Sequence, residues 1–191
     1  MTDVKIFPLG RLMANCCLIL DGSGGAVVID PGGDPSPVIR YMQGRDAVCL
    51  AILLTHGHPD HTEGVEALRE ATGAPVLIGE KDAARLEKRP DILLSGGERL
   101  TYGGTELEVI AAPGHTPGGV CYLTDGYLFS GDTLFRQSVG RTDLPGGDTQ
   151  ELFVTLEKLT DRFRDSDVTV VPGHGMVTDF RYETENNPFL R

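Results

Sequence analysis

The stretch His56-Gly57-His58-Pro59-Asp60-His61 places three histidines and one aspartate within six residues. Gly57 and Pro59 favour a tight, non-helical backbone between them. Two imidazoles that stand two residues apart in such a loop can reach one metal ion, while the adjacent Asp60 and His61 can turn towards a second ion. Because imidazole is the commonest metal ligand in proteins and carboxylates complete many such sites, the stretch predicts a metal centre.

The other two histidines stand in similar glycine-containing segments. One segment is Pro113-Gly114-His115-Thr116-Pro117-Gly118, and the other is Pro172-Gly173-His174-Gly175. Between them, Ser130-Gly131-Asp132 contributes a carboxylate. The chain has five histidines and all of them lie in segments of this kind, which indicates one shared centre rather than isolated polar residues.

Hydrophobic runs place several of these segments at the ends of predicted strands. The run 48–55 is almost wholly apolar, as in a strand buried on both faces, and it ends at His56. Helices are predicted over 36–43, 62–72, 80–88 and 148–162, and further strands over 4–9, 16–20, 26–30, 75–79, 99–102, 105–110, 119–124, 127–130 and 168–171. Neither half can close a core alone. We therefore expect one domain over residues 1–191, with two sheets packed face to face and helices outside.

Composition narrows the class of protein. The formal net charge of −11 disfavours nucleic acid and anionic membranes as partners, because phosphate contacts need lysine and arginine. No apolar run approaches the ~18 residues of a membrane span. The first ten residues lack a basic start and a long apolar core, so we expect no secretory signal and a cytoplasmic location. The four cysteines lie in apolar runs without a Cys-x-x-Cys spacing, which predicts reduced, buried thiols.

The motif His-x-His-x-Asp-His, followed by Gly-His-Thr-Pro-Gly, Ser-Gly-Asp and Pro-Gly-His, resembles the metallo-β-lactamase superfamily. The motifs stand in the order typical of that family and span residues from about 15 to 175. The resemblance implies an α/β fold, the four-layer αβ/βα sandwich of the metallo-β-lactamase type. It also implies seven ligands, which are His56, His58 and His115 for a first metal, Asp60, His61 and His174 for a second, and Asp132 as a bridge between the two.

The implied centre activates water. Two cations about 3.5–4 Å apart lower the pKa of a bridging water towards ~7 and so supply a hydroxide nucleophile. Asp60 and Asp132 are the implied catalytic carboxylates. Zinc is the favoured metal, although iron and manganese suit the same ligands. Behind the ligands we expect three supporting residues, with an aspartate accepting a hydrogen bond from a ligand imidazole; these are Asp30, Asn15 and Thr55, each of which could instead be a plain strand-end residue.

Within the superfamily the chain resembles the short, single-domain glyoxalase II-like branch, the hydroxyacylglutathione hydrolases. The segments 138–143 and 187–190 carry this part of the resemblance. It implies hydrolysis of a small-molecule thioester such as S-lactoylglutathione. Arg141 can grip a substrate carboxylate, or it can form an ion pair with Asp143. The longer members bind glutathione partly through a basic C-terminal helical domain, which has no counterpart in these residues, so the thiol of the substrate stays open.

Other functions fit parts of the pattern. Lactamases of one class use a cysteine where this chain has Asp132, and another class lacks the bridging carboxylate. Persulfide dioxygenases use one iron held by two histidines and an aspartate, here His56, His115 and Asp132. Those enzymes tend to carry Pro-Ala-His-Asp where this chain has Pro172-Gly173-His174-Gly175, which favours the hydrolase. A metallo-hydrolase of another ester or lactone, and a metal-binding protein without activity, are the remaining alternatives.

Overall fold

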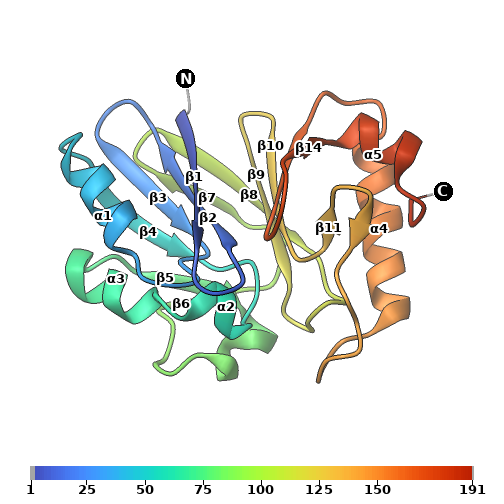
Figure 1. The fold of residues 1–191 in the computed structure, drawn as a ribbon, viewed down its shortest axis with the longest axis horizontal. Coiled ribbons are helices and arrows are strands. Elements are labelled where there is room, and N and C mark those ends of the chain that lie inside the picture. The colour runs from blue at the N-terminus through green and yellow to red at the C-terminus, as the bar shows by residue number, and fades with distance from the viewer. Residues whose placement is uncertain (1–2, 191) are drawn as a thin grey trace.

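Two six-stranded sheets lie face to face in the computed structural model, which describes residues 3–190, and helices cover the outer face of each sheet (Figure 1). The spatial order is β1-β2-β3-β4-β5-β6 in the first sheet and β14-β13-β10-β9-β8-β7 in the second. This arrangement confirms the predicted α/β sandwich. The prediction of one domain over 1–191 stays a prediction, and residues 1, 2 and 191 lie outside the described range.

The first sheet is antiparallel at its start and parallel afterwards. Two hairpins join its first three strands, and the helices α1 and α3 then cross over the outer face to give parallel pairs. The elements of this half are β1 (Asp3–Leu9), β2 (Ala14–Leu20), β3 (Gly25–Ile29), α1 (Ser36–Gln43), β4 (Val48–Leu53), α2 (Pro59–Thr62), α3 (Val65–Thr72), β5 (Val76–Gly79), the 3₁₀ helix η1 (Glu80–Arg85) and β6 (Ile92–Leu94).

The second sheet is antiparallel except where β10 pairs with β13. A small β11–β12 hairpin lies between β10 and β13 in the chain. The helices α4 and α5 cover the outer face of the second sheet. The elements are β7 (Arg99–Tyr102), β8 (Thr105–Ala111), β9 (Val120–Thr124), β10 (Tyr127–Gly131), β11 (Leu134–Phe135), β12 (Ser138–Val139), α4 (Thr149–Phe163), β13 (Thr169–Pro172), β14 (Thr178–Asp179) and α5 (Phe180–Asn186). Among residues 3–190, no helix has the length and apolar character needed to cross a membrane.

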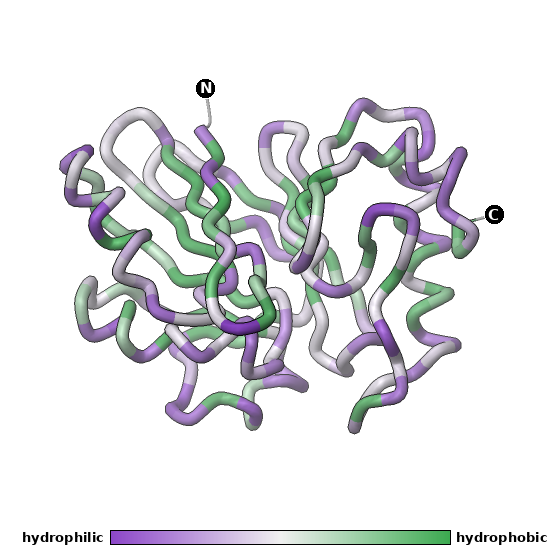
Figure 2. Tube along the Cα trace, viewed as in Figure 1, coloured by the Kyte–Doolittle hydropathy of each residue, from purple (hydrophilic) through white to green (hydrophobic). Residues whose placement is uncertain are grey.

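Strand alternation explains why the central strands are apolar throughout. In β2, Leu18 packs under α1 and α3, whereas Ile19 points between the two sheets. In β4, Ile52 and Leu53 divide in the same way. A third apolar cluster lies between the second sheet and α4 with α5. Three hydrophobic layers therefore separate four layers of secondary structure. Figure 2 shows the hydrophobic character of the central strands.

The structure corrects two predicted helices. The helix expected over 62–72 begins only at Val65, as α3, and Thr62 ends the separate short helix α2. The chain bends between them at Gly64, whose amide donates to the Pro31 carbonyl oxygen at 2.8 Å. A side chain at Gly64 would overlap the carbonyl oxygen of Gly33, so the bend needs a residue without Cβ. The helix expected over 80–88 is only the short 3₁₀ helix η1. The helix expected over 148–162 is confirmed as α4, and Asp148 caps it by accepting from two backbone amides.

One turn carboxylate joins the two sheets. Asp21 accepts the amide of Gly104, in the β7–β8 turn, at 2.7 Å, and the amides of Ser23 and Gly25 in its own turn at 2.7 and 2.9 Å. These hydrogen bonds, the one from Gly104 above all, lower the pKa of Asp21 to about 2. The folded-state pKa is thus below the unfolded value of ~3.9, so the carboxylate stabilises the fold above the unfolded pKa and loses that effect as pH falls through about 2.

We expect Asp21→Asn to lower the free energy of unfolding by about 1 kcal/mol at pH 7, because a neutral side chain replaces the charged carboxylate that accepts all three amides. The deficit should shrink as pH falls from 4 to 2, since the wild-type carboxyl is then protonated as well. Urea denaturation of chelator-treated protein across this range measures the effect, with the exposed Asp165→Asn as control. A deficit that is the same at pH 7 and pH 2 would contradict this assignment.

Candidate metal centre

The seven predicted ligands lie at one edge of the two sheets, and four of them come just after the end of a strand. His56 follows β4, His115 follows β8, Asp132 follows β10 and His174 follows β13. The remaining three, His58, Asp60 and His61, stand at or in the short helix α2, which lies at the same edge (Figure 1). The two sheets thus bring together residues that are up to 118 positions apart in the chain (174 − 56).

The predicted ligands fall into two groups, each with all its ligand atoms within 4.8 Å of one another, and a third such group of Asp30, His56 and His61 overlaps both. The first group is His56, His58 and His115, and the Nδ1 atom of His58 lies 2.9 Å from Nε2 of His115. The second group is Asp60, His61 and His174. There the two imidazole Nε2 atoms are 3.2 Å apart, and Oδ2 of Asp60 lies 3.0 Å from Nε2 of His174.

Asp132 lies between the two groups. Its Oδ1 is 3.4 Å from Nε2 of His61, and its Oδ2 is 3.5 Å from Nε2 of His115. Its Oδ2 is also 3.8 Å from Nε2 of His174. A Cβ atom on Gly173 would overlap Oδ1 of Asp132, so the backbone beside the carboxylate must remain glycine. This is the geometry expected of a carboxylate that bridges two cations.

Hydrogen bonds on the far side of two imidazoles determine which nitrogen carries the proton. Nδ1 of His115 lies 2.7 Å from the Arg141 carbonyl oxygen, and Nδ1 of His174 lies 3.1 Å from the Leu12 carbonyl oxygen. A carbonyl oxygen only accepts, so each Nδ1 carries the proton. When these rings are neutral, Nε2 of His115 and Nε2 of His174 each carry a lone pair that points into the centre. Without a bound cation, a second proton on Nε2 of His174 is donated to Asp60 at 3.0 Å, which raises the pKa of His174.

Asp30 does the same for two of the other three imidazoles, directly for His61 and through Thr55 for His56. Its carboxylate accepts the Thr55 amide at 2.7 Å, the Thr55 hydroxyl at 2.6 Å and Nδ1 of His61 at 3.0 Å. Because the hydroxyl gives its only proton to Asp30, it accepts from Nδ1 of His56 at 3.1 Å. His56 and His61 thus also present Nε2 lone pairs, as proposed for a supporting carboxylate.

This donor set fits divalent metal ions. Nε2 of His56 and Oδ1 of Asp132 are buried without a hydrogen-bond partner, which is costly unless something absent from the protein chain binds them. The other ligand nitrogens and oxygens contact one another, as Nδ1 of His58 and Nε2 of His115 do at 2.9 Å and Nε2 of His174 and Oδ2 of Asp60 do at 3.0 Å. Neutral imidazole and carboxylate oxygen suit zinc, iron and manganese. The His/Asp cluster can therefore hold metal, and its ligand chemistry does not choose among these ions.

The surroundings of the predicted ligands shift their pKa values. Burial and the neighbouring imidazoles lower the pKa of His56 well below its usual value, so it is neutral. The hydrogen bond from His174 lowers the pKa of Asp60 to about 2, so Asp60 is ionised. Burial lowers the pKa of His61, but the carboxylates of Asp132 and Asp30 raise it to about 10. A cation bound at His61 therefore releases a proton, and its affinity falls as pH is lowered.

Comparison with known proteins agrees with this geometry. A sequence model of the metallo-β-lactamase superfamily matches residues 9–174 of the chain. The chain belongs to the metallo-β-lactamase superfamily. The matched range includes all seven predicted ligands, and the match confirms the resemblance drawn from the motifs.

Members of the superfamily that are similar along their whole length carry several names. Hydroxyacylglutathione hydrolase GloC of Haemophilus influenzae is 32% identical over 98% of this chain and 98% of its own length. The crystal structure of BLEG-1 B3 metallo-β-lactamase superposes with a TM-score of 0.94 and 35% identity, covering 98% of this chain and 99% of that one. The structure of TTHA1623 in a di-iron-bound form gives a TM-score of 0.85 and 36% identity, covering 97% and 100%.

The predicted supporting residues Asp30, Asn15 and Thr55 lie beside the ligands, whereas the side chain of Arg141, the predicted substrate contact, points elsewhere. Asn15 donates from Nδ2 to the carbonyl oxygens of Pro172 and Gly175 at 2.9 and 3.0 Å, and so holds the loop that carries His174. The side chain of Arg141 forms a bidentate ion pair with Asp143, both contacts being 2.7 Å, and it is 62% exposed. Only the backbone of Arg141 touches the centre, through His115. The ion-pair alternative is therefore the one the structure shows.

Sequence reasoning missed three fully buried polar residues around the centre: Asp82, Glu183 and Asn187. Glu183 accepts the amide of Gln137 at 2.7 Å, and Asn187 donates to the Ser138 carbonyl oxygen at 3.1 Å. Both therefore hold the β11–β12 hairpin that follows Asp132. Segment 187–190 stands out by its resemblance to the glyoxalase II-like branch, but no sequence pattern indicates that Glu183 and Asn187 are buried.

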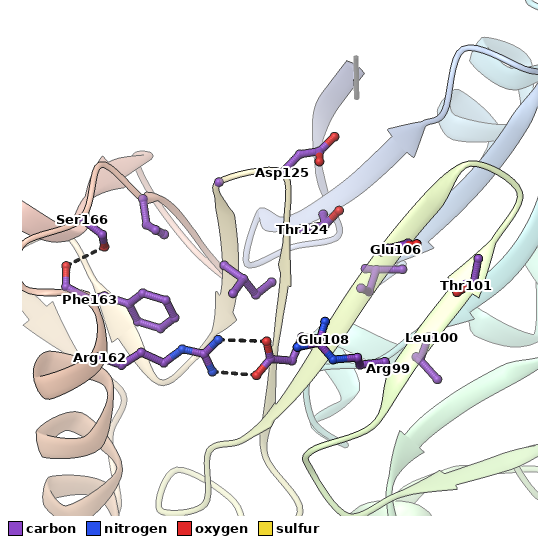
Figure 3. Close-up of a pocket in the computed structure, with 14 residues that line it drawn as sticks. Arg99, Leu100, Thr101, Glu106, Glu108, Thr124, Asp125, Arg162, Phe163 and Ser166 are labelled. Carbon is purple, nitrogen blue, oxygen red and sulfur yellow. Dashed lines mark hydrogen bonds and ion pairs between the residues drawn. The ribbon is translucent and has the colours of Figure 1, made fainter.

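A separate hollow of about 630 Å³ lies between the β7–β8 hairpin and the end of α4 (Figure 3). Its most prominent charged groups, Glu108 and Arg162, bind each other at 2.6 and 2.8 Å. No histidine or cysteine lines it among the described residues. The lining of this hollow includes none of the seven predicted metal ligands.

Proposed function

We propose that the protein is a dinuclear metallo-hydrolase that cleaves a thioester such as S-lactoylglutathione. The position of Asp132 carries the proposal, because its two oxygens face the two separate ligand groups. Metal 1 is assigned to His56, His58 and His115, and metal 2 to Asp60, His61 and His174. The name of the Haemophilus relative supports the thioester as substrate class.

Each group of this chain has a defined task in that reaction. Two bound divalent ions, zinc being favoured, supply an activated water and polarise the carbonyl group. Asp60 is ionised and 24% exposed, so it lies on the open side of the centre and can orient the attacking water. Asp30 and Thr55 keep His56 and His61 in the ligating tautomer. The leaving thiol needs no strong acid, because its pKa is near 8.5.

The proposal includes a small-molecule partner and a cytoplasmic location. Within it, Arg141 contacts a substrate carboxylate only if the ion pair with Asp143 opens, since both guanidinium contacts are already made. The acidic chain still disfavours nucleic acid and anionic membranes as partners.

Metal analysis combined with substrate assays tests the proposal. We expect two metal ions per chain and release of free thiol from S-lactoylglutathione in the absence of oxygen. One iron per chain, with oxygen uptake on glutathione persulfide and no thiol release, would overturn it in favour of a dioxygenase. Hydrolysis of a chromogenic cephalosporin without thioesterase activity would overturn it in favour of a β-lactamase, the activity for which the BLEG-1 relative is named.

A further inference from the structure

One buried carboxylate outside the ligand set joins two loops of the centre. Asp82, in η1, is fully buried. Its Oδ2 accepts the amide of Gly57 and its Oδ1 accepts the amide of Gly118, each at 2.9 Å. Its closest cation is Arg85, whose Nε lies 3.6 Å from Oδ1. Burying a carboxylate is costly unless it is well hydrogen-bonded, so these two amides are what holds Asp82 in place.

The two amides belong to loops that carry the three histidines of the first metal group. Gly57 lies between His56 and His58, after β4 of the first sheet, and Gly118 lies three residues after His115, before β9 of the second sheet. The facing nitrogens of His58 and His115 are 2.9 Å apart. Such a spacing needs both loops placed to within about 0.5 Å, which a shared rigid acceptor provides.

Close packing around Asp82 leaves no room for adjustment. A Cβ atom on Gly118 would lie 2.5 Å from the backbone nitrogen of Asp82 and 2.8 Å from its Cγ. A Cβ atom on Gly57 would lie 2.7 Å from Cδ of Arg85. Arg85 also donates to the Pro145 carbonyl oxygen at 2.6 Å, in the loop that follows Arg141. The 3₁₀ helix therefore contacts three loops around the first metal group.

We propose that Asp82 is a positioning residue that sets the separation of His58 and His115, and thereby the affinity of the His56–His58–His115 site for its cation. The Asp60–His61–His174 site makes no contact with Asp82 among the described residues, so its affinity should be independent of this carboxylate. The inference rests on the metal centre of the proposed function but not on any substrate.

Single-site affinities test the proposal without an activity assay. His174→Ala leaves the three-histidine site, and His115→Ala leaves the other site; Co²⁺ affinity in each background is measured by competition with a chelator. Adding Asp82→Asn should weaken Co²⁺ binding 10–100-fold in the His174→Ala background and less than about 3-fold in the His115→Ala background. Asp91→Asn is the matched control, because Asp91 also accepts a backbone amide, that of Val76 at 2.9 Å, away from the centre.

A second variant covers the case in which Asp82→Asn fails to fold. Gly118→Ala keeps the carboxylate but forces the loop away from it, and it should produce the same selective weakening. Equal affinities for Asp82→Asn and its background, or equal weakening of both sites, would overturn the proposal. Absence of Co²⁺ binding by the wild-type protein would instead overturn the metal centre itself.

Discussion

Asp132→Ala is expected to reduce thioester hydrolysis by at least about a thousandfold, equivalent to ~4 kcal/mol of transition-state stabilisation. The carboxylate of Asp132 is the group that faces both ligand sets, at 3.4 Å from His61 and 3.5 Å from His115. Without it, two cations would face each other with less negative charge between them. We therefore expect the metal content to fall from two ions per chain to one or fewer.

The same variant should change the fold little when metal is removed. The contacts of the Asp132 carboxylate are 3.4 to 3.8 Å long, and Oδ1 makes no hydrogen bond. The chelator-treated variant should therefore unfold within about 1 kcal/mol of the chelator-treated wild type. Elemental analysis, turnover and urea denaturation are compared with the exposed Asp161→Ala on α4. Two metals per chain and full turnover in Asp132→Ala would exclude the dinuclear assignment.

Asp30→Asn should weaken both metal sites at once, because it inverts one tautomer in each. The amide Nδ2 would replace Oδ2, the oxygen that now accepts from Thr55 and His61. The Thr55 hydroxyl would then donate to Nδ1 of His56, and Nδ1 of His61 would have to accept. Both imidazoles would carry their proton on Nε2, the nitrogen that must ligate. We expect metal affinity to fall 10–100-fold at each site, and activity by at least about a hundredfold.

The tautomer can be observed directly. Nitrogen NMR of the chelator-treated protein should show the proton of His56 on Nδ1 in wild type and on Nε2 in Asp30→Asn. Asp46→Asn is the matched control, because Asp30 and Asp46 share a positive φ of 51°, where asparagine and aspartate are both tolerated. The control therefore places asparagine at the same positive φ, but at a position without the buried hydrogen bonds of Asp30. An Asp30→Asn protein that keeps the wild-type His56 tautomer and metal affinity would refute this account.

Much of the fold could be predicted from local patterns. The wholly apolar run around Ile52 and Leu53 predicts a strand buried on both faces, and these side chains do divide between two hydrophobic layers. The patterns failed where local signals are short. The bend at Gly64 is required by the neighbouring Pro31 and Gly33 loop, which helical periodicity does not detect. Strand β14 and helix α5 are too short to leave a periodic signal of their own.

The sequence by itself determined which groups gather at the centre. Clusters of histidine and aspartate in glycine-containing loops after apolar strands are typical of metal sites. Such loops lie close together when the strands end at the same edge of a sheet. All seven predicted ligands are there. What they bind and hydrolyse remains the proposal tested above.

Only the tertiary structure decided how those groups are held. The hydrogen bonds that choose each tautomer and position each loop join Asp30 to Thr55, Asp82 to Gly118 and Asn15 to Gly175, across 25, 36 and 160 residues. Arg141 was assigned to its ion pair with Asp143 by side-chain geometry alone. Sequence periodicity indicates which face of a helix or strand is buried. It does not indicate which polar groups pair, because a hydrogen bond forms only when folding brings donor and acceptor within ~3.5 Å.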